Sequence, residues 1–319
     1  MEIEHKETRT GRRKRRFRFG RFFFLILLLS VVGMATFSVL QYREGSNLAG
    51  ENGASEDEDF TGDTKDPKYM HIENILLIGV DDDGSGKSRS DTMIVASWNK
   101  DNDTVKLISF MRDIYADIPR YESYKLNTAY YLDGVQLLKD TLTGMFGIPI
   151  HHYALIDFDN FETLIDIAAP NGVEVNVEKE MSEKIGVTLM PGTQQLSGKE
   201  LLGYARFRAD QEGDFGRVAR QQKVIEALKE ELLSPSSLPR IPKLAGAVNG
   251  YIQTDLTTGE EIRKVIEIMA GGGLEIDKMT VPVEGSYSFA SYSHAGSVIE
   301  LDLDQNKQAI SKFIGMPLR

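Results

Sequence analysis

One uninterrupted apolar segment near the N-terminus constrains this chain more than any other feature. Residues 22–40 contain no charged residue, and their length is close to the roughly 20 residues that a helix needs to cross a bilayer core. A cleaved secretory signal has a shorter apolar region of about 7–15 residues, and a buried core helix would not follow so basic a flank. We therefore expect a single membrane-spanning helix over residues 22–40.

A cluster of basic residues immediately before this segment sets the expected orientation. Residues 1–21 hold nine lysines and arginines against three glutamates, with most of the basic residues between Arg12 and Arg21. Such clusters stay on the cytoplasmic side of a membrane. A nucleic-acid-binding arm has a similar composition, but direct contact with the apolar segment favours a topology signal. The sequence predicts a single-pass type II protein of the cell membrane, with a basic cytoplasmic tail (1–21) and an extracellular C-terminal domain.

The rest of the chain is strongly acidic. The whole chain carries a formal net charge of −11 and residues 1–21 carry +6, so the remainder carries −17. Nucleic-acid binding relies on lysines and arginines that neutralise phosphates, so this charge argues against nucleic acid as a partner. The chain has no cysteine, which excludes disulfides, thiol chemistry and cysteine-ligated metal sites.

After the apolar segment, the sequence predicts a linker and then one domain. Residues 45–65 are rich in Gly, Ser, Asn, Asp and Glu, so we expect a flexible acidic linker over residues 41–68. From residue 69 to 319, strand-like and helix-like stretches alternate, which predicts an α/β sandwich. Three prolines between 235 and 242 predict a break after the longest helix. The expected strands cover 75–80, 92–98 and 105–110, and the expected helices cover 134–146, 158–168, 198–204, 215–233 and 304–314.

Two known motifs almost match the loop after the first strand. Gly84-Ser85-Gly86-Lys87-Ser88 resembles the end of a P-loop, but Asp81 stands where that motif needs its first glycine. The same loop resembles a calcium-binding loop, but Thr92 stands where a bidentate glutamate belongs, and a strand rather than a helix precedes it. Neither a nucleotide site nor a calcium site is expected.

Two aspartates and an arginine lie near the end of the first expected strand. Asp81 stands where this strand ends, and ligands of open α/β sheets bind outside the carboxyl ends of strands. Arg89 and Asp91 are two residues apart, so on an extended backbone both side chains point the same way. Magnesium binds to one or two carboxylates together with substrate oxygens. These three side chains are therefore candidates for a site that holds Mg²⁺ and phosphate.

Four further arginines follow on two neighbouring elements. Arg206 and Arg208 alternate with other residues, so in a strand they would share one face. Arg217, Arg220 and Gln221 fall at i, i+3 and i+4, which lie on one face of a helix. Arginine forks bind phosphate oxygens in pairs and keep their charge, as a pyrophosphate site requires.

A structural role is the alternative for each of these arginines. Glu200, Asp210, Glu212 and Asp214 lie close by in the sequence and could pair with them on a solvated surface. Asp214 also precedes a helix, where a carboxylate often caps the first turn and interacts favourably with the helix dipole. An acidic domain has little reason to concentrate cations in one region, so for the set as a whole we favour a functional site.

The order and spacing of these residues resemble those of the LytR-CpsA-Psr family over nearly the whole outer domain. The matching stretches are Asp81 after its strand, Arg89-Ser90-Asp91-Thr92, Met111-Arg112-Asp113, Lys125-Leu126-Asn127, Ala205-Arg206-Phe207-Arg208, Gly213-Asp214-Phe215-Gly216-Arg217 and Arg220-Gln221-Gln222. Residues 111–119 and 201–222 are most similar to the MsrR-like branch, often described as regulatory proteins. The chain departs from the usual family pattern at Phe110-Met111 and near Pro170-Asn171, which concerns backbone shape more than charge.

The resemblance implies a three-layer α/β/α sandwich with a mixed central sheet and a pocket for a polyprenyl chain. It implies a transferase that moves a phosphate-linked glycan, such as teichoic acid or a capsule-like polymer, from undecaprenyl pyrophosphate to peptidoglycan, forming a phosphodiester. The partners would be the lipid-linked glycan, peptidoglycan and the membrane lipid bilayer. The alternative is a membrane regulatory protein that binds lipid-linked wall precursors and affects cell-envelope or virulence gene expression without turnover.

The resemblance also implies roles for individual residues. Asp81 and Asp91 would bind the metal, Mg²⁺ or Mn²⁺, and with Arg89 and Arg112 would form the catalytic group. The pyrophosphate would be held by Arg89, Arg112, Arg206, Arg208, Arg217, Arg220 and Gln221. Lys125, Asn127 and Asp214 are weaker candidates, because Lys125 and Asn127 could instead start a helix. Phosphoryl transfer depends mainly on positioning and charge neutralisation, and the sequence leaves open whether one aspartate takes the proton of the attacking hydroxyl.

Two other groups of residues suggest binding sites less strongly. His151 and His152 are adjacent, so their side chains diverge on a strand, and no matching ligand cluster is evident in the sequence. Phe158, Phe161 and Leu164 could line a lipid pocket, but their helical spacing favours packing in the core.

Overall fold

The computed structural model describes residues 19–48, 59–81, 88–102, 104–256 and 275–318, without the side chains of residues 19–32 and of Leu238. The chain divides into two compact units, residues 1–40 and 41–319. Helix α1 (Phe19–Leu48) runs through the predicted membrane span. In the described part of the chain, no helix is long and apolar enough to cross a membrane. Residues 1–18 and the side chains of 22–32 lie outside the described residues, so the tail and the span stay predictions.

The linker predicted over residues 41–68 is shorter than expected. Residues 41–48 form the end of α1 and contact α6 (Ile241–Tyr251) so closely that a Cβ atom on Gly45 would lie 1.9 Å from a backbone oxygen of α6. Asp63 pairs with Lys139 at 2.7 Å and accepts a hydrogen bond from the Ile150 amide at 2.8 Å. Both ends of the predicted linker are therefore part of the domain, and residues 49–58 lie outside the described residues.

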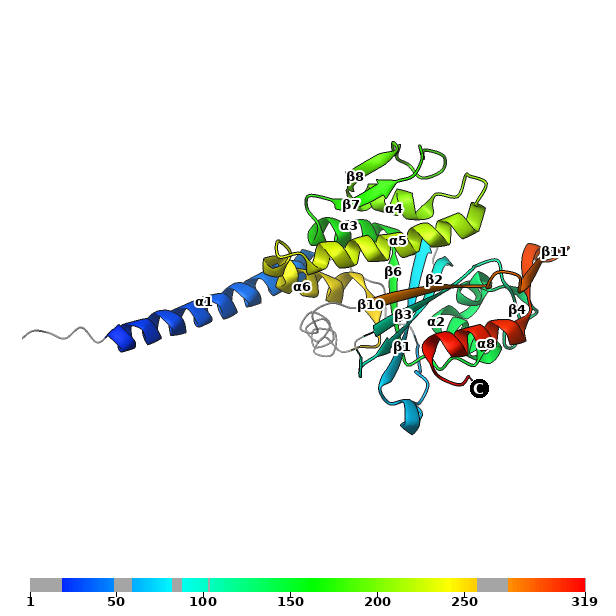
Figure 1. Ribbon diagram of the computed structural model, residues 1–319, viewed down its shortest axis with the longest axis horizontal. Helices are drawn as coiled ribbons and strands as arrows, with labels where there is room; N and C mark the ends of the chain where they lie inside the picture. The colour runs from blue at the N-terminus through cyan, green and yellow to red at the C-terminus, as the bar shows by residue number, and fades with distance from the viewer. Residues whose placement is uncertain (1–18, 49–58, 82–87, 103, 257–274, 319) are drawn as a thin grey trace, which may run out of the picture. The chain divides into compact units, whose positions relative to one another are not determined.

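In the described residues of the domain, six strands form a mixed sheet with the order β10-β3-β2-β1-β6-β9 (Figure 1). The strands are β1 (Ile72–Asp81), β2 (Arg89–Asn99), β3 (Thr104–Phe110), β6 (His152–Asp157), β9 (Gln253–Thr254) and β10 (Glu275–Val281). The pairs β1–β6 and β3–β10 are parallel, and the other neighbours are antiparallel. The mixed sheet that the family resemblance implied is therefore present.

Helices cover both faces of this sheet. One face carries α2 (Asn127–Phe146) and α8 (Leu303–Ile314), and the other carries α3 (Phe158–Ala168), α4 (Gly198–Arg206) and α5 (Gly213–Leu233) (Figure 1). Alternate residues of β1, such as Leu76 and Ile78, are fully buried in the core with α2 and α8. The intervening residues face the α3–α5 side and are only half-buried. The outcome is the expected three-layer α/β/α arrangement.

Within the described ranges, the chain also forms three two-stranded sheets. They are formed by β4 (Tyr115–Ala116) with β5 (Tyr124–Lys125), β7 (Val173–Val177) with β8 (Gly192–Leu196), and β11 (Tyr287–Tyr292) with β12 (Gly296–Leu301). Short 3₁₀ helices occupy Pro67–Tyr69 and Leu238–Arg240. The β11–β12 hairpin is joined to the loop after β3 by a hydrogen bond from the Ile299 amide to the Asp113 carbonyl oxygen at 2.9 Å.

Most expected elements are present, with differences at their ends. Helix α3 has the predicted bounds, and the predicted break after α5 ends at Pro242, near the start of α6. Helix α2 begins at Asn127, before the predicted residue 134, and a non-helical kink at Asp133 and Gly134 interrupts it, in which Gly134 adopts a φ of 64°. Only glycine adopts this φ without steric cost, so Gly134 permits the kink. The strand expected around Arg206 and Arg208 is wrong, because α4 continues to Arg206.

Candidate functional site

A polar cavity of about 640 Å³ lies at the carboxyl end of β1, the edge predicted from Asp81. We call it the arginine cavity. Its lining includes Asp81, Asp91, Thr92, Arg112, Arg206, Arg208, Arg217 and Gln221. Residues that are far apart in the sequence therefore meet here, because β1, β2, α4 and α5 all end or begin at this edge of the domain.

A second polar cavity of about 640 Å³ adjoins the first. We call it the lysine cavity. Its lining includes Arg89, Asp113, Tyr124, Lys125, Asn127, Thr128 and Tyr131. Asp81, Asp91, Arg112 and Arg208 line both cavities and form what we call the shared wall. Two substrates bound in the two cavities would therefore contact the same four side chains.

Asp91 reaches the shared wall through a β-bulge. In the β1–β2 ladder, Val80 pairs with Ser90 and Gly79 pairs with Thr92, so Asp91 is the extra residue. A bulge bends its strand and re-aims a side chain. Asp91 and Arg89 both line the lysine cavity. Asp91 Oδ1 lies 2.6 Å from a guanidinium nitrogen of Arg112, and the predicted convergence of Asp81, Arg89 and Asp91 is present.

Asp81 and Arg206 form the outer part of the arginine cavity. Asp81 Oδ2 lies 3.1 Å from Arg206, and both side chains are partly exposed. The Arg206 guanidinium also lies 4.4 Å from the centre of the Phe158 ring, a favourable cation–π contact. Arg89 makes a similar contact with Tyr131 at 5.5 Å.

Arg206 and Arg208 share the arginine cavity although they do not lie in a strand. Arg206 ends α4, Phe207 follows with extended dihedral angles, and Phe207 is buried. The two arginines therefore lie on one side and Phe207 on the other, as predicted, although the backbone is not a strand. The extended residue after the helix turns Phe207 into the core and leaves both arginines at the cavity.

On α5, Arg217 and Gln221 point to the arginine cavity. Arg217 has only 5% of its side chain exposed and lies 3.8 Å from Asp91 Oδ1. Burial, followed by the charge of Arg112, holds the pKa of Arg217 below its ordinary value. Gln221 donates a hydrogen bond from Nε2 to the Thr92 hydroxyl at 2.9 Å, which ties α5 to β2.

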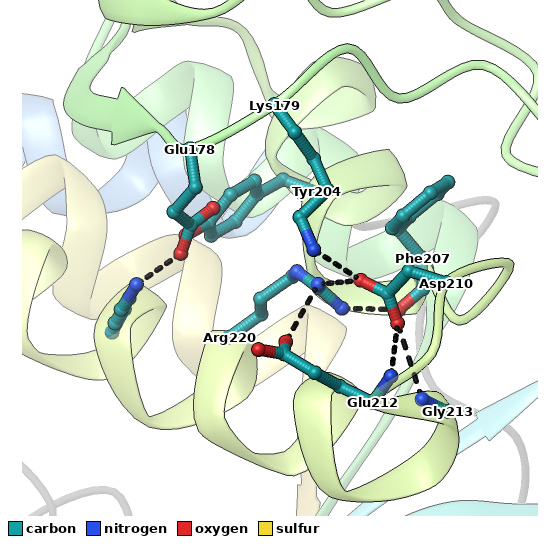
Figure 2. A network of polar contacts seen from close by, with 9 residues as sticks. Glu178, Lys179, Tyr204, Phe207, Asp210, Glu212, Gly213 and Arg220 are labelled. Atoms are coloured by element: carbon teal, nitrogen blue, oxygen red, sulfur yellow. Dashed lines mark hydrogen bonds and ion pairs between the residues drawn. The ribbon is translucent and has the colours of Figure 1, made fainter.

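Arg220 is not brought to either polar cavity. Its side chain is 2% exposed, pairs with Asp210 and with Glu212, and donates to the Phe207 carbonyl oxygen at 2.9 Å (Figure 2). Lys179 also lies 3.0 Å from Asp210. Arg220 therefore pairs with nearby acidic residues, which was the alternative to a functional role. To contact a pyrophosphate, as predicted, Arg220 would have to leave this network.

Asp214 lies behind Arg112 and Arg217 rather than capping α5. Its oxygens lie 3.5 Å from Arg112 Nε and 3.4 Å from Arg217, and the helix begins after Glu212 without a side-chain cap. Burial, followed by a hydrogen bond with Asp113, holds the pKa of Asp214 above its ordinary value. Its contacts with Arg112 and Arg217 position both arginines.

Asp113 and Lys125 continue this network into the lysine cavity. Lys125 Nζ lies 2.8 Å from Asp113 Oδ1. Burial alone would raise the pKa of Asp113, but hydrogen bonds from Asp214 and Lys125 outweigh it and hold this pKa below its ordinary value. Asn127 is the first residue of α2 and lines the same cavity, while Leu126 occupies the cap position.

Arg112 is the charge centre of the site. Burial alone would lower its pKa, but the nearby Asp91 and Asp214 outweigh burial, so the pKa of Arg112 lies above its ordinary value. Its Nε is buried without a hydrogen-bond partner among the described residues, although Asp214 lies at 3.5 Å. A fully charged guanidinium at the lining of both cavities is suited to bind a phosphate oxygen.

An apolar cavity of about 350 Å³ opens beside the arginine cavity. It lies between the half-buried face of β1, β2 and β6 and helices α3 to α6. Phe158, Phe161 and Leu164 line it, as the lipid-pocket alternative suggested, while Phe161 and Leu164 also pack against buried core clusters. Thr92, Phe158, Leu202, Ala205 and Gln221 line both this cavity and the arginine cavity. The apolar cavity therefore adjoins the site that holds the arginines.

The carboxylates at the shared wall fit a magnesium ion. Among the described residues, no group of three or more His, Asp or Glu side chains could hold a metal by themselves. Magnesium usually needs only one or two carboxylates, and completes its shell with water and phosphate oxygens. Asp81 pairs with Arg206 through Oδ2 and Asp91 pairs with Arg112 through Oδ1, and the other oxygen of each carboxylate would bind such an ion.

His151 and His152 belong to separate structural contacts at the other end of β1. His151 Nδ1 accepts a hydrogen bond from the Asn74 amide at 2.9 Å, and burial, followed by the charge of Lys65, lowers the pKa of His151 to about 4. His152 lies 3.2 Å from Glu73 and 2.8 Å from Asp255. These contacts tie β6 to its neighbours.

The sequence profile of the LytR_cpsA_psr family matches residues 37–311 of this chain. The chain belongs to the LytR-CpsA-Psr family. The regulatory protein MsrR of Staphylococcus aureus is 43% identical to it over 241 residues, which cover 76% of this chain and 74% of MsrR. The polyisoprenyl-teichoic acid--peptidoglycan teichoic acid transferase TagU of Enterococcus faecalis is 33% identical over 252 residues, with coverages of 76% and 78%.

The fold agrees with solved structures of LytR-CpsA-Psr proteins. The crystal structure of TagV from B. subtilis superposes with a TM-score of 0.64 at 26% identity, and the match covers 77% of this chain and 98% of that structure. The family resemblance drawn from the motifs of this chain is therefore confirmed.

Some site residues of this LytR-CpsA-Psr protein were not singled out from the sequence. Asp113 stood in a matching motif without a role, and Thr92 and Tyr131 line the cavities without any charge that would draw attention. For Asp113 a signal existed, because it directly follows Arg112. For Tyr131, only the contact between its ring and Arg89 reveals the position.

Proposed function

We propose that this LytR-CpsA-Psr protein transfers a phosphate-linked glycan from a polyprenyl-pyrophosphate carrier to peptidoglycan. The observation that carries the proposal is that the apolar cavity adjoins the arginine cavity and shares Thr92, Ala205 and Gln221 with it. A lipid tail needs an apolar space, and the pyrophosphate attached to it needs cations at the end of that space. A molecule with a lipid tail joined to a pyrophosphate therefore matches an apolar cavity that lies next to a cavity lined by arginines.

In the proposed reaction, a hydroxyl oxygen of peptidoglycan attacks the phosphorus that carries the glycan. The new bond forms as the bond between this phosphorus and the bridging oxygen breaks, and the lipid monophosphate leaves with that oxygen. Arg112, Arg206, Arg208 and Arg217 bind the non-bridging oxygens and neutralise the charge that develops on the leaving group. The proton of the hydroxyl passes to a carboxylate of the shared wall, Asp81 or Asp91.

Magnesium is part of this proposal. Asp81 and Asp91 are the residues that would hold it, and a bound Mg²⁺ or Mn²⁺ would add positive charge beside the phosphate oxygens. Arg112 orients Asp91 through the contact at 2.6 Å. Arg206 does the same for Asp81 at 3.1 Å.

The names of the relatives support two different functions. TagU is named as a teichoic acid transferase that acts on peptidoglycan, whereas MsrR, with a higher identity to this chain, is named as a regulatory protein. A module that binds lipid-linked precursors without turnover would need the arginines but not both aspartates. The presence of Asp81 and Asp91 at the shared wall favours the transferase.

Turnover in vitro tests the proposal. The full-length protein in liposomes would receive a short synthetic lipid-pyrophosphate glycan and peptidoglycan strands, with and without Mg²⁺. We expect metal-dependent release of lipid phosphate and a wall-linked glycan, with loss of both in Asp91→Ala and Arg208→Ala. Arg120→Ala, at an arginine that is 68% exposed and lines neither cavity, is the matched control and should keep activity. Tight donor binding without turnover, with several donors, would instead support the regulatory function.

We further propose that the protein spans the cell membrane once, with the tail in the cytoplasm and the domain outside. The support is the apolar segment 22–40 and the basic tail 1–21. Protease added to intact cells should remove a C-terminal epitope tag and spare an N-terminal one. Protection of both tags would contradict this orientation.

A further inference from the structure

A cluster of aromatic rings stands at the rim of the lysine cavity and has no part in the proposed chemistry. It consists of Tyr115, Tyr124, Tyr292 and His294, and we call it the aromatic platform. Tyr115 comes from β4 and Tyr124 from β5, while Tyr292 and His294 come from the tip of the β11–β12 hairpin. The three tyrosines are half-buried and His294 is exposed. A surface of this kind is available to a partner.

The rings are held in fixed positions. Tyr115 and Tyr292 stack with their centres 4.6 Å apart and their planes at 18°. His294 lies 5.7 Å from Tyr292 and 5.8 Å from Tyr124, and its Nε2 lies 3.1 Å from the Ser123 carbonyl oxygen. The Tyr292 hydroxyl donates a hydrogen bond to Glu300. Such preorganisation lowers the entropy cost when a partner binds.

The platform is continuous with the site. Tyr124 and Ala295, the residue that follows His294, both line the lysine cavity. The hairpin that carries Tyr292 is bound to the backbone at Asp113, directly after Arg112. A chain-like ligand that lies on the platform can therefore extend one end into the lysine cavity and reach the shared wall.

The location of the platform relative to the apolar cavity indicates that it binds the acceptor and not the donor. The apolar cavity shares lining residues with the arginine cavity and none with the lysine cavity, in the part of the chain that the structure describes. If the lipid occupies the apolar cavity, the lipid phosphate leaves on that side. The attacking oxygen of an in-line displacement approaches from the opposite side. This is the side of the lysine cavity and of the platform.

The chemistry of the platform fits sugars. A pyranose ring has a face of C–H groups that packs on aromatic rings and an edge of hydroxyls that needs hydrogen-bond partners. Tyrosine and histidine offer an apolar ring together with a polar atom, and Glu300 and the Ser123 carbonyl oxygen lie beside them. The platform carries no cation of the kind that would attract a phosphate-rich polymer.

We propose that the aromatic platform binds the glycan strand of the peptidoglycan acceptor and presents one of its hydroxyls to the shared wall. This inference rests on the proposed transferase function and adds the acceptor subsite to it. Tyr292 and His294 are positioning residues, since they touch sugars beside the reacting one.

Steady-state kinetics of the full-length protein in liposomes tests the proposal. Tyr292→Ala should raise the KM for soluble, uncrosslinked peptidoglycan strands by about tenfold, the loss expected for one aromatic stacking contact. The KM for the lipid-linked donor should stay within twofold of the wild-type value. Hydrolysis of the donor in the absence of peptidoglycan should also be unchanged, because water needs no platform.

Two variants act as controls. Phe289→Ala removes an aromatic ring that is 69% exposed on the same hairpin but outside the platform, and it should leave the acceptor KM unchanged. Tyr292→Phe keeps the ring and loses the hydrogen bond to Glu300, so it should retain most of the affinity for the acceptor. Equal melting temperatures of all variants would show that they fold.

Direct binding separates the failure of this inference from failure of the proposed function. A defined peptidoglycan tetrasaccharide is titrated into the full-length protein in detergent and followed by calorimetry. Weaker binding to Tyr292→Ala than to Phe289→Ala supports the platform, even if no transfer is detected. Equal binding to the wild type and Tyr292→Ala, or a rise in donor KM as large as that in acceptor KM, would overturn it.

Discussion

The arginines of this site fall into distinct groups once their partners are known. Arg112, Arg206, Arg208 and Arg217 line the arginine cavity, whereas Arg220 is enclosed by Asp210, Glu212 and a backbone oxygen. The spacing of the residues in the sequence predicted one face of α5 for Arg217 and Arg220 together. It could not show that the loop after α4 folds back over Arg220, because that depends on how residues 207–212 pack.

Substitution of Asp91 should reduce the proposed transfer activity strongly. Asp91→Asn keeps the shape but removes the negative charge that would bind the metal and that lies 2.6 Å from Arg112. We expect kcat/KM for transfer to fall by about 10²–10³-fold, as for the loss of one preorganised charge at a transferring group. Donor binding without turnover should persist. A variant with kcat/KM within threefold of the wild-type value would contradict the role given to Asp91.

Asp210 supports stability rather than chemistry. Asp210→Asn leaves a buried guanidinium with a weaker partner, so the free energy of unfolding should fall by about 3 kcal/mol, measured by urea denaturation. Glu212→Gln removes the second carboxylate on the same guanidinium, but Glu212 is 62% exposed, so a change below about 0.5 kcal/mol is expected. A similar loss of unfolding free energy in both variants would show that the burial of the carboxylate does not determine its contribution to stability.

The same variant has a pH dependence with a defined sign. Burial alone would raise the pKa of Asp210, but hydrogen bonds from Lys179 and Arg220 hold it below its ordinary value. A carboxyl with a lowered pKa in the folded state stabilises the protein above the unfolded pKa of about 4, and this contribution is lost as the pH falls through the folded pKa. The difference in stability between the wild type and Asp210→Asn should therefore shrink in acid.

At the scale of elements, the boundaries show what sequence patterns can and cannot predict. Helix α4 has a capping box from Ser197 to Glu200 that is visible in the sequence, and its start was predicted correctly. Its end was not, because Arg206 and Arg208 alternate like strand residues while the helix continues to Arg206. The β-bulge at Asp91 was also unpredictable, since it depends on the pairing of β2 with β1.

The apolar cavity gives a prediction at this scale. Ala154 lies on β6 and lines the cavity, so the larger side chain of Ala154→Phe would fill part of its 350 Å³. The KM for a donor with a long polyprenyl chain should rise by about tenfold, through lost burial of apolar groups. A donor with a short isoprenoid chain, which leaves the cavity partly empty, should be affected less. An equal effect on both donors would mean that the lipid binds elsewhere.

At the scale of the whole molecule, contacts far from the site join segments that are distant in the sequence. His151 lies near the start of β1, at the end of this strand away from the shared wall. It is 6% exposed and accepts a hydrogen bond from the Asn74 amide of β1. The sequence predicted neither this contact nor the attachment of residues 59–66 to the domain. Composition alone suggested a flexible linker there, while the ion pair of Asp63 with Lys139 spans residues far apart in the chain.

His151 makes the stability of the whole molecule depend on pH. Its pKa is about 4 in the folded protein and about 6.5 when unfolded, so between these values the unfolded state binds more protons. Stability should therefore fall as the pH is lowered from 6.5 to 4, by at most about 3 kcal/mol from this residue. His151→Gln, whose amide oxygen can accept the same hydrogen bond, should reduce this slope in urea unfolding. An unchanged slope would contradict the assignment.

The shared wall also constrains the kinetic mechanism of the proposed two-substrate reaction. Asp81, Asp91, Arg112 and Arg208 border both polar cavities, so transfer to peptidoglycan requires both reactants to be bound at the same time. Initial-rate plots for one substrate at several fixed levels of the other should intersect, whereas a double-displacement enzyme gives parallel lines. A small molecule anchored on these four side chains would then compete with both substrates at once, although each reaches them from a different side.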